Sequence, residues 1–234
     1  MKRIASYIIT VFVLSACVSN NNQNNIGQEY IGARYLRDPL GEGFAPDSDP
    51  QIRFDAFDCT TFVETVLAKG NINKLQHIRY KNGNISFVNR NHFIETDWLT
   101  NNSYLVENIS PQFDGVKYRD VTIDKQSWLW HVHKINASVE KQHTRVAYIP
   151  YNAITKINNS EPLIVLFIVG KSKKFDKIGT DLAVVHMGFL MPGGQILRHA
   201  SLYSGYVTDV KFDEYIARRK KMPNNIGIAL VKIK

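Results

Sequence analysis

The stretch of residues 182–201 constrains the fold most strongly, because it holds two apolar runs joined by a short turn. Residues 182–190 are apolar apart from the imidazole of His186, and residues 195–201 have the composition of a returning strand. The Pro-Gly-Gly sequence at residues 192–194 is typical of a hairpin turn. The pattern therefore predicts an antiparallel hairpin whose first strand is buried.

The position of the turn fixes which residues face one another in this hairpin. With Gly193 and Gly194 at the tip, His186 pairs with Ser201, and His199 is its diagonal neighbour on the same face. A buried imidazole is costly unless a partner satisfies it, so we expect His199 to orient His186. A shift of one residue would turn His199 to the other face as an ordinary surface residue, and that alternative stays open.

Residues 57–68 predict a helix that begins close to a cysteine. Its apolar residues recur at helical spacing on one face: Phe62, Val63, Val66 and Leu67. Asp58 is suited to capping the helix, which places Cys59 in the first turn. Free backbone N–H groups and the helix dipole favour a thiolate there, so we interpret Cys59 as a nucleophile. The alternative is a buried cysteine that acts as a small apolar residue.

The N-terminal residues are typical of a bacterial lipoprotein signal. Lys2 and Arg3 precede an apolar run over residues 4–14, and the run leads into Leu-Ser-Ala and Cys17. We expect residues 1–16 to be a signal peptide, Cys17 to be lipidated, residues 17–29 to form a polar tether, and residues 30–234 to form one domain. The alternative is a short buried or membrane helix with an incidental cysteine.

Lipidation of Cys17 would leave Cys59, the only other cysteine, without a disulfide partner. An unpaired thiol in an exported protein is a candidate reactive group. The formal net charge of +8 would fall to +6 once Lys2 and Arg3 are removed, because residues 1–16 contain no acid. For an exported chain this modest charge indicates anionic lipid or wall polymer rather than nucleic acid, or simply a solvated surface. We expect a monomer.

Several other residues carry candidate functions. Arg90 is suited to gripping a substrate carboxylate, and a structural ion pair with Glu95 or Asp97 is the alternative. The Asn-Gly pair within residues 78–87 predicts a hairpin that leads into this arginine. His131 and His133 alternate as metal ligands can, but no nearby carboxylate or cysteine completes a set. We therefore expect no metal or cofactor, and a segment packed through its tryptophans.

The rest of the chain predicts helices and strands in one mixed domain. Residues 163–169 are a buried-strand run, residues 209–219 read as a helix, and residues 226–233 predict a final strand. A helix near the start with a sheet afterwards favours an α+β fold.

The segments just described resemble a known family. Phe57-Asp58-Cys59, His186-Met187-Gly188-Phe189 and His199-Ala200-Ser201 resemble the signature segments of NlpC-type papain-like peptidoglycan hydrolases. The longer Cys59 segment, with residues 89–93 and 97–98, is similar to the N-acetylmuramoyl-L-alanine amidase-like branch. The resemblance implies a papain-like (NlpC-type) fold with an N-terminal catalytic helix packed on an antiparallel sheet.

This resemblance also implies an activity and a set of site residues. Cys59 would be the nucleophile, His186 the general base and acid, and His199 the orienting residue, hydrolysing the muramoyl-L-alanine amide of peptidoglycan or its fragments. The residues expected to bind substrate are Tyr35, Asp58, Arg90, His92 and Trp98. Tyr35 would replace a tyrosine that many relatives carry shortly before the cysteine.

Two other functions remain compatible with the sequence. The same site could cut a peptide bond within the stem peptide, because cysteine and histidine chemistry attacks either amide. A lipid-tethered wall-binding protein with a merely buried Cys59 is the non-catalytic alternative. We expect the protein to be anchored in the cell envelope, at the periplasmic face of the outer membrane if the cell is Gram-negative.

Overall fold

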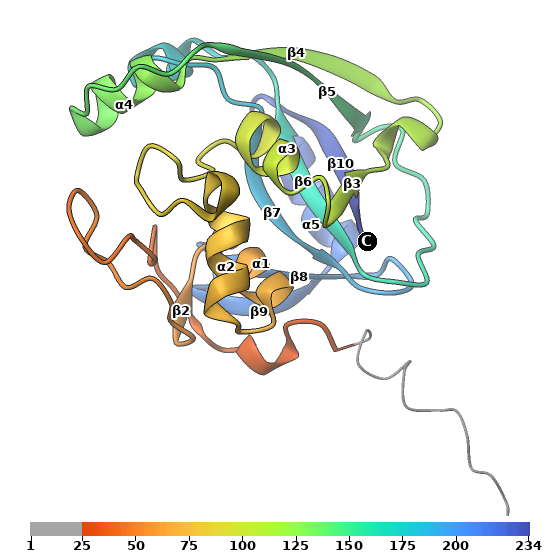
Figure 1. Cartoon of the computed structure of the whole chain (residues 1–234). Helices are drawn as coiled ribbons and strands as arrows, with labels where there is room; N and C mark the ends of the chain where they lie inside the picture. The colour runs from red at the N-terminus through yellow and green to blue at the C-terminus, as the bar shows by residue number, and fades with distance from the viewer. Residues whose placement is uncertain (1–24) are drawn as a thin grey trace, which may run out of the picture.

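The centre of the molecule is a ten-stranded β-sheet, seen in a computed structural model that describes residues 25–234 (Figure 1). The strand order is β2-β1-β9-β8-β7-β6-β10-β5-β4, with β3 paired to β10 beside this path. The strands are β1 (Arg34–Tyr35), β2 (Ala56–Phe57), β3 (Val106–Asn108), β4 (Lys117–Ile123), β5 (Gln142–Pro150), β6 (Leu163–Val169), β7 (Val184–Leu190), β8 (Ile196–Ser201), β9 (Tyr206–Lys211) and β10 (Asn225–Ile233). The predicted signal peptide, Cys17 and most of the predicted tether lie outside the described residues.

Almost all neighbouring strands run antiparallel, and the exception is the short parallel pair β1 and β2. The predicted hairpin is confirmed as β7 and β8, which pair Phe189 with Arg198 and Leu190 with Leu197 in the expected register. Gly193 and Gly194 at its tip have φ of 84° and 69°, a conformation that glycine adopts without a steric penalty. The turn chemistry therefore sets the register of the two histidine strands.

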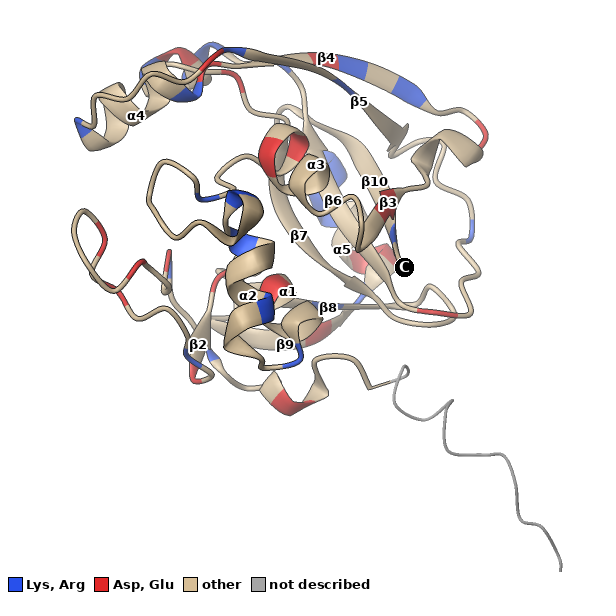
Figure 2. Ribbon diagram, viewed as in Figure 1, with Lys and Arg blue, Asp and Glu red and all other residues tan. Residues whose placement is uncertain are grey.

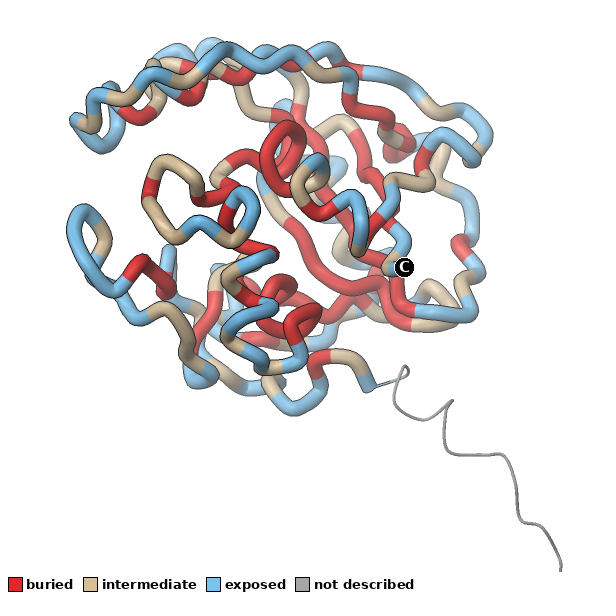
Figure 3. The backbone as a smooth tube through the Cα atoms, viewed as in Figure 1, coloured by how far each residue is buried: buried red, intermediate tan, exposed pale blue. Residues whose placement is uncertain are grey.

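β6 separates two apolar cores, because every one of its residues is buried. Leu166 and its alternate neighbours pack toward α1 (Cys59–Ala68), whereas Val165 and Phe167 pack toward the face covered by α5 (Phe212–Lys221). Figure 3 shows this buried centre, with exposed segments around it. The fold is therefore a mixed α+β arrangement in which helices cover both faces of one large sheet.

The helix α1 begins as the sequence predicts, with Asp58 as its cap. The Asp58 Oδ1 accepts a hydrogen bond from the Thr61 N–H at 2.8 Å, and the Thr61 hydroxyl accepts one from the Asp58 N–H at 2.9 Å. Such a cap stabilises a helix by about 1 kcal/mol. Burial extends around the whole helix over residues 61–68, where Glu64 pairs with Arg79 at 2.9 Å. α1 is therefore held firmly against the sheet with Cys59 at its leading end.

Two sequence predictions about local structure are wrong. Residues 78–87 do not form a hairpin, because α2 (Ile72–Arg79) extends through the first expected strand, capped by Asn71 and packed through its apolar side chains. The Asn-Gly pair still turns the chain, since Asn82 and Gly83 have φ of 53° and 71°. The helix expected from residue 209 starts only at Phe212, because the preceding residues pair with β8 as β9.

The remaining helical segments lie in the connections between strands. They are η1 (Gln28–Tyr30), η2 (Lys81–Gly83), η3 (Ile94–Trp98), α3 (Leu99–Asn101), η4 (Ser110–Gln112), α4 (Lys125–His133) and η5 (Lys173–Ile178). α4 lies at the end of the long β4 and β5 ribbon, and Figure 2 marks basic residues on the ribbon of β4. Within residues 25–234, no helix is both long and apolar enough to span a bilayer.

Candidate functional site

The candidate site is built around two histidines on adjacent strands. His186 of β7 and His199 of β8 form a hydrogen bond of 2.8 Å between Nε2 and Nδ1. Gly188, two residues after His186, makes this contact possible, because a Cβ atom there would lie 2.8 Å from the His199 Cβ. The expected diagonal pairing of the two rings is present. Their hydrogen bond leaves Nδ1 of His186 as the ring nitrogen available to another group.

An aromatic layer surrounds the two imidazoles. The Tyr215 ring of α5 lies 4.9 Å from the His199 ring and 6.0 Å from the His186 ring, and Phe167 lies 5.5 Å from His186. Burial holds the pKa of His186 well below its usual value, and the adjacent His199 contributes to this shift. Burial, with the charge of Arg218, lowers the pKa of His199 to about 4. Both rings are therefore neutral at neutral pH.

Cys59 approaches this histidine pair from the N-terminus of α1. The backbone amide of Met187, the residue after His186, lowers the pKa of the Cys59 thiol, and a charge on the sulfur would raise that of Tyr215. The sulfur thus lies beside β7 and within electrostatic reach of the ring that packs on both histidines. The Thr60 hydroxyl lies 3.9 Å from it.

The electrostatic setting of Cys59 differs from the sequence expectation. Burial raises the pKa of the thiol to about 12, and the Asp58 carboxylate adds to that shift. The helix N-terminus and the Met187 amide act in the expected direction, but removal of water from a small anion outweighs them. A thiol with this raised pKa is neutral at rest, so a thiolate would form only as its proton is transferred.

Tyr35 and Asp58 are brought to the same place as Cys59. Tyr35 of β1 pairs with Phe57 of β2, which places it next to the start of α1. Burial raises the pKa of Tyr35 to about 12, and the nearby Cys59 and Asp58 contribute to the shift. The predicted role of Tyr35 near the thiol is therefore compatible with its position.

Arg90 occupies a different environment from the one predicted for a substrate-binding residue. Its guanidinium is buried among the carboxylates of Asp38, Glu42 and Asp47, at 3.2, 2.8 and 2.6 Å. We call this group the Arg90 cluster. The ion pair is structural, but its partners are not the two acids considered from the sequence, Glu95 and Asp97. With three carboxylates around it, Arg90 has no free side for a substrate.

Those two acids have other partners. Asp97 forms an ion pair of 2.8 Å with Lys125, and Glu95 Oε1 accepts a hydrogen bond from the Ala183 amide at 2.6 Å. Both bonds attach η3 to neighbouring segments, and the Glu95 bond reaches the residue just before β7. They therefore support the position of the histidine strand.

His92 and Trp98 do not join the thiol and the histidine pair through any contact seen in the structure. His92 lies at hydrogen-bond distance, 2.7 Å, from the Phe87 carbonyl oxygen and packs on Trp128. Trp98 has no exposed surface, so it cannot touch a bound molecule in this conformation. Both side chains stabilise the layer that carries η3.

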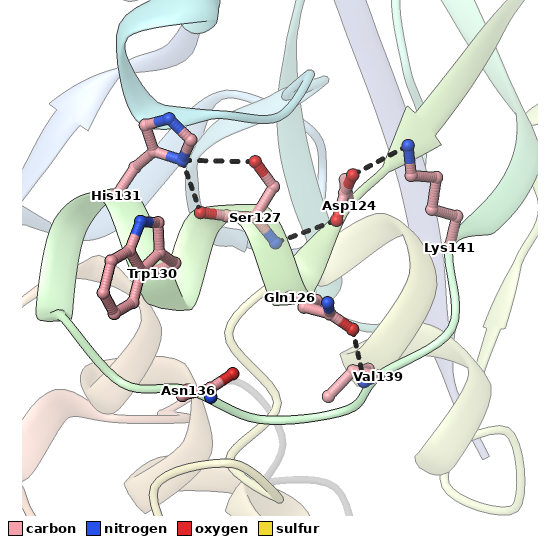
Figure 4. Close-up of a pocket in the computed structure, with 8 residues that line it drawn as sticks. All are labelled: Asp124, Gln126, Ser127, Trp130, His131, Asn136, Val139 and Lys141. Atoms are coloured by element: carbon pink, nitrogen blue, oxygen red, sulfur yellow. Dashed lines mark hydrogen bonds and ion pairs between the residues drawn. The ribbon is translucent and has the colours of Figure 1, made fainter.

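The two histidines of α4 have separate surroundings. His131 lies at hydrogen-bond distance from the Ser127 carbonyl oxygen, 2.8 Å, and borders a cavity of about 520 Å³ (Figure 4). His133 packs instead on Trp128 and Phe87. Trp128 packs as expected, whereas the Trp130 side chain is 55% exposed, so the prediction of a segment packed through both tryptophans is only half confirmed. Among the described residues, no group of three or more His, Cys, Asp or Glu side chains is arranged for a metal ion.

Sequence reasoning missed two residues of the site. Tyr215 was expected only as part of the helix over residues 209–219, yet it packs on both histidines. Gly188 gave no local signal, because its importance depends on how the strands pack. Only the spacing of Gly188 from His186, on the same strand face, could have indicated its role.

The fold and the site define a mixed α+β protein in which a thiol at a helix N-terminus lies next to the strand that carries one of two hydrogen-bonded histidines. The chain belongs to the AmiA-like family, described as N-acetylmuramoyl-L-alanine amidase-like, whose model matches residues 25–226. No curated protein matches the sequence.

Solved structures share this fold. Protein LPG0564 from Legionella pneumophila, of the DUF1460 family, is 27% identical, with a TM-score of 0.82 over 91% of this chain and 88% of its own. An N-acetylmuramoyl-L-alanine amidase from Bacteroides uniformis is 21% identical, with a TM-score of 0.69 over 91% and 98%. A putative xylanase from Bacteroides fragilis is 22% identical, with a TM-score of 0.69 over 89% and 99%. The last two likenesses concern the fold alone.

Proposed function

We propose that this protein hydrolyses the amide between the muramoyl lactyl group and L-alanine, in peptidoglycan or its turnover fragments, with a papain-like (NlpC-type) catalytic arrangement. The hydrogen bond between His186 and His199, beside the helix that begins with Cys59, is the observation that carries the proposal. Family membership supplies the substrate class.

The proposed reaction begins with proton transfer from the Cys59 thiol to Nδ1 of His186, while its Nε2–H donates to His199. The sulfur then attacks the lactyl carbonyl, and His186 returns the proton to the departing amine of L-alanine. Water attacks the resulting thioester, giving its proton through His186 back to the sulfur and releasing the lactyl carboxylic acid. Unpaired N–H groups in the first turn of α1 are suited to stabilising the oxyanion.

His199 is well suited to its proposed role as a positioning residue. Its lowered pKa keeps the ring neutral, so its Nδ1 can accept a hydrogen bond from a protonated His186. This bond fixes which nitrogen of His186 faces the sulfur. Tyr215 restricts both rings by packing on them.

The direct test is to incubate the parent protein and a Cys59→Ala variant with muropeptides and to weigh the products. We expect the parent to release a peptide beginning with L-alanine and the variant to lose at least about a thousandfold in rate. Equal rates would rule out the thiol mechanism. A sugar that keeps part of its peptide would identify a stem endopeptidase, and binding without cleavage would identify a wall-binding protein.

We also propose that the protein is exported and anchored through a lipid on Cys17, with the basic mature chain acting at the envelope. The sequence of residues 1–17 supports this proposal. Membrane fractionation of parent and Cys17→Ser cells, with mass analysis of the N-terminal peptide, tests it. An unmodified N-terminal peptide in the soluble fraction of parent cells would contradict the anchor.

A further inference from the structure

The arginines of this molecule differ in whether they have an acidic partner. Seven of the ten within residues 25–234 lie within 4 Å of a carboxylate: Arg34, Arg53, Arg79, Arg90, Arg119, Arg145 and Arg198. The three without one are Arg37, Arg218 and Arg219. Arg37 lies near Tyr35, and the other two belong to the last turn of α5. All three therefore surround the candidate site.

Arg218 and Arg219 are each separated from a site histidine by a single aromatic ring. The Arg218 guanidinium carbon lies 5.4 Å from the Tyr215 ring centre, and that ring packs on His199. The Arg219 guanidinium carbon lies 5.2 Å from the Phe167 ring centre, and that ring packs on His186. The positive charge of α5 is thus directed at the edge of the catalytic arrangement.

Arg219 also carries polar atoms without a partner. Its Nε and Nη2 are buried and make no well-aligned hydrogen bond, although the buried Tyr151 hydroxyl lies close enough for Arg219 to oppose the rise of the Tyr151 pKa through its charge and a side-chain hydrogen bond. The only contact of Nη1 is a weak one of 4.0 Å with the Met222 sulfur. The helix dipole explains why cations gather at the end of α5, but not why charged donors are buried without an acceptor. Such donors are suited to an anionic ligand.

We propose that Arg219, assisted by Arg218, binds a carboxylate on the peptide side of the scissile amide. A guanidinium can grip a carboxylate through two parallel hydrogen bonds. The exposed Arg218 would meet the carboxylate first, and the Arg219 guanidinium, whose Nε and Nη2 are buried in the free protein, would turn outward to complete the grip. The ligand class is therefore a muramoyl peptide with a free carboxylate rather than a neutral or amidated one. This inference rests on the proposed function for the identity of the scissile bond.

The test compares two substrates, an N-acetylmuramoyl-L-alanyl peptide with a free C-terminal carboxylate and the same peptide with a C-terminal amide. The parent protein should prefer the carboxylate about ten- to a hundredfold in kcat/KM, the size expected for a charge-assisted hydrogen-bond pair. Arg219→Gln should abolish the preference, and Arg219→Lys should keep only part of it. Lys220→Gln, an exposed cation in the same turn, is the matched control and should keep it in full.

Binding to a Cys59→Ala background, measured by calorimetry with the same two peptides, separates this inference from the proposed activity. If the parent cleaves neither peptide but the carboxylate form still binds through Arg219, the proposed function fails and the carboxylate site stands. Equal binding of both peptides, or equal losses for both in Arg219→Gln, overturns the carboxylate site. Should Arg219→Gln fail to fold, Arg218→Gln changes an exposed side chain and must weaken the preference.

Discussion

The guanidinium groups of Arg90 and Arg219 differ in whether carboxylates surround them. Arg90 lies among three carboxylates, one of them the fully buried Glu42, and every bond serves the fold. Arg219 has no carboxylate and keeps two buried nitrogens unsatisfied beside the histidine pair. The comparison shows that a buried arginine indicates a ligand-binding role only when no carboxylate is bonded to its guanidinium. A guanidinium that already donates to carboxylates has no free N–H group for a ligand.

The largest effect on stability should come from replacing Arg90, the cation of the Arg90 cluster. Arg90→Met leaves Asp38, Glu42 and Asp47 facing one another without compensation, so the free energy of unfolding should fall by about 3 to 5 kcal/mol. Urea unfolding measures this change. Arg145→Met is the control, since its pair with Asp120 is exposed, and it should change stability by less than about 0.5 kcal/mol. If the free energy of unfolding of Arg90→Met falls by less than about 1 kcal/mol, the Arg90 cluster does not have the structural role assigned to it.

The histidine pair should give a pH dependence that the Arg90 cluster does not. The His199 pKa is lowered from 6.5 to about 4, so the folded state favours the neutral ring. Its contribution to stability is complete above pH 6.5 and is lost as the pH falls toward 4. This loss amounts to about 3.5 kcal/mol, at about 1.4 kcal/mol for each pKa unit between 6.5 and 4.

A His199→Gln variant isolates that contribution. The difference in unfolding free energy between pH 7.5 and pH 4.5 should be smaller in this variant than in the parent. Parallel pH profiles for the two proteins would show that His199 is not held neutral by the fold.

Crowding at Gly188 should disturb the site more than the fold. In Gly188→Ala the new Cβ meets the His199 Cβ and the Arg198 carbonyl, each at 2.8 Å. We expect a stability loss of about 1 to 3 kcal/mol and a ten- to hundredfold fall in kcat/KM, because small displacements of catalytic groups are costly. Gly170→Ala provides similar crowding against the Asn224 side chain, 2.7 Å away, and should keep its activity. Matching activity losses in both variants would exclude a specific effect on His199.

The smallest effect should come from removing one charge beside the thiol. Asp58→Asn keeps a good helix cap, so stability should change by only about a few tenths of a kcal/mol. The Asp58 carboxylate raises the Cys59 pKa, so the variant thiol should ionise at a lower pH. The pH dependence of iodoacetamide alkylation measures this shift. An unchanged or higher midpoint would mean that Asp58 does not act on the thiol.

The parts of the fold that the sequence predicted well depend on local chemistry. The Pro-Gly-Gly turn determined the register of β7 and β8, and a cap followed by an apolar stripe determined where α1 starts. The same local rules placed Cys59, His186 and His199 in elements that the fold brings together. The identity of the catalytic group remains a proposal, but its elements and their orientation were predictable.

The parts that sequence did not predict depend on distant partners. Arg90 was assigned to a substrate because its acids come from residues 38–47, which no spacing rule connects to it. Desolvation of Cys59, a half-buried residue at the start of α1, reversed the expected direction of its pKa shift, since desolvation depends on packing. Arg219 could be singled out only after seven of the ten arginines within residues 25–234 had been matched with an acid.

The position of β10 in the sheet has a consequence for how the molecule is made. This strand is the last along the chain, yet it lies between β6 and β5 and also pairs with β3. A nascent chain that has not yet delivered residues 225–233 therefore leaves two strand edges unsatisfied in the middle of its sheet. The sheet therefore cannot close until residues 225–233 have been synthesised, and the preceding polypeptide stays open until then.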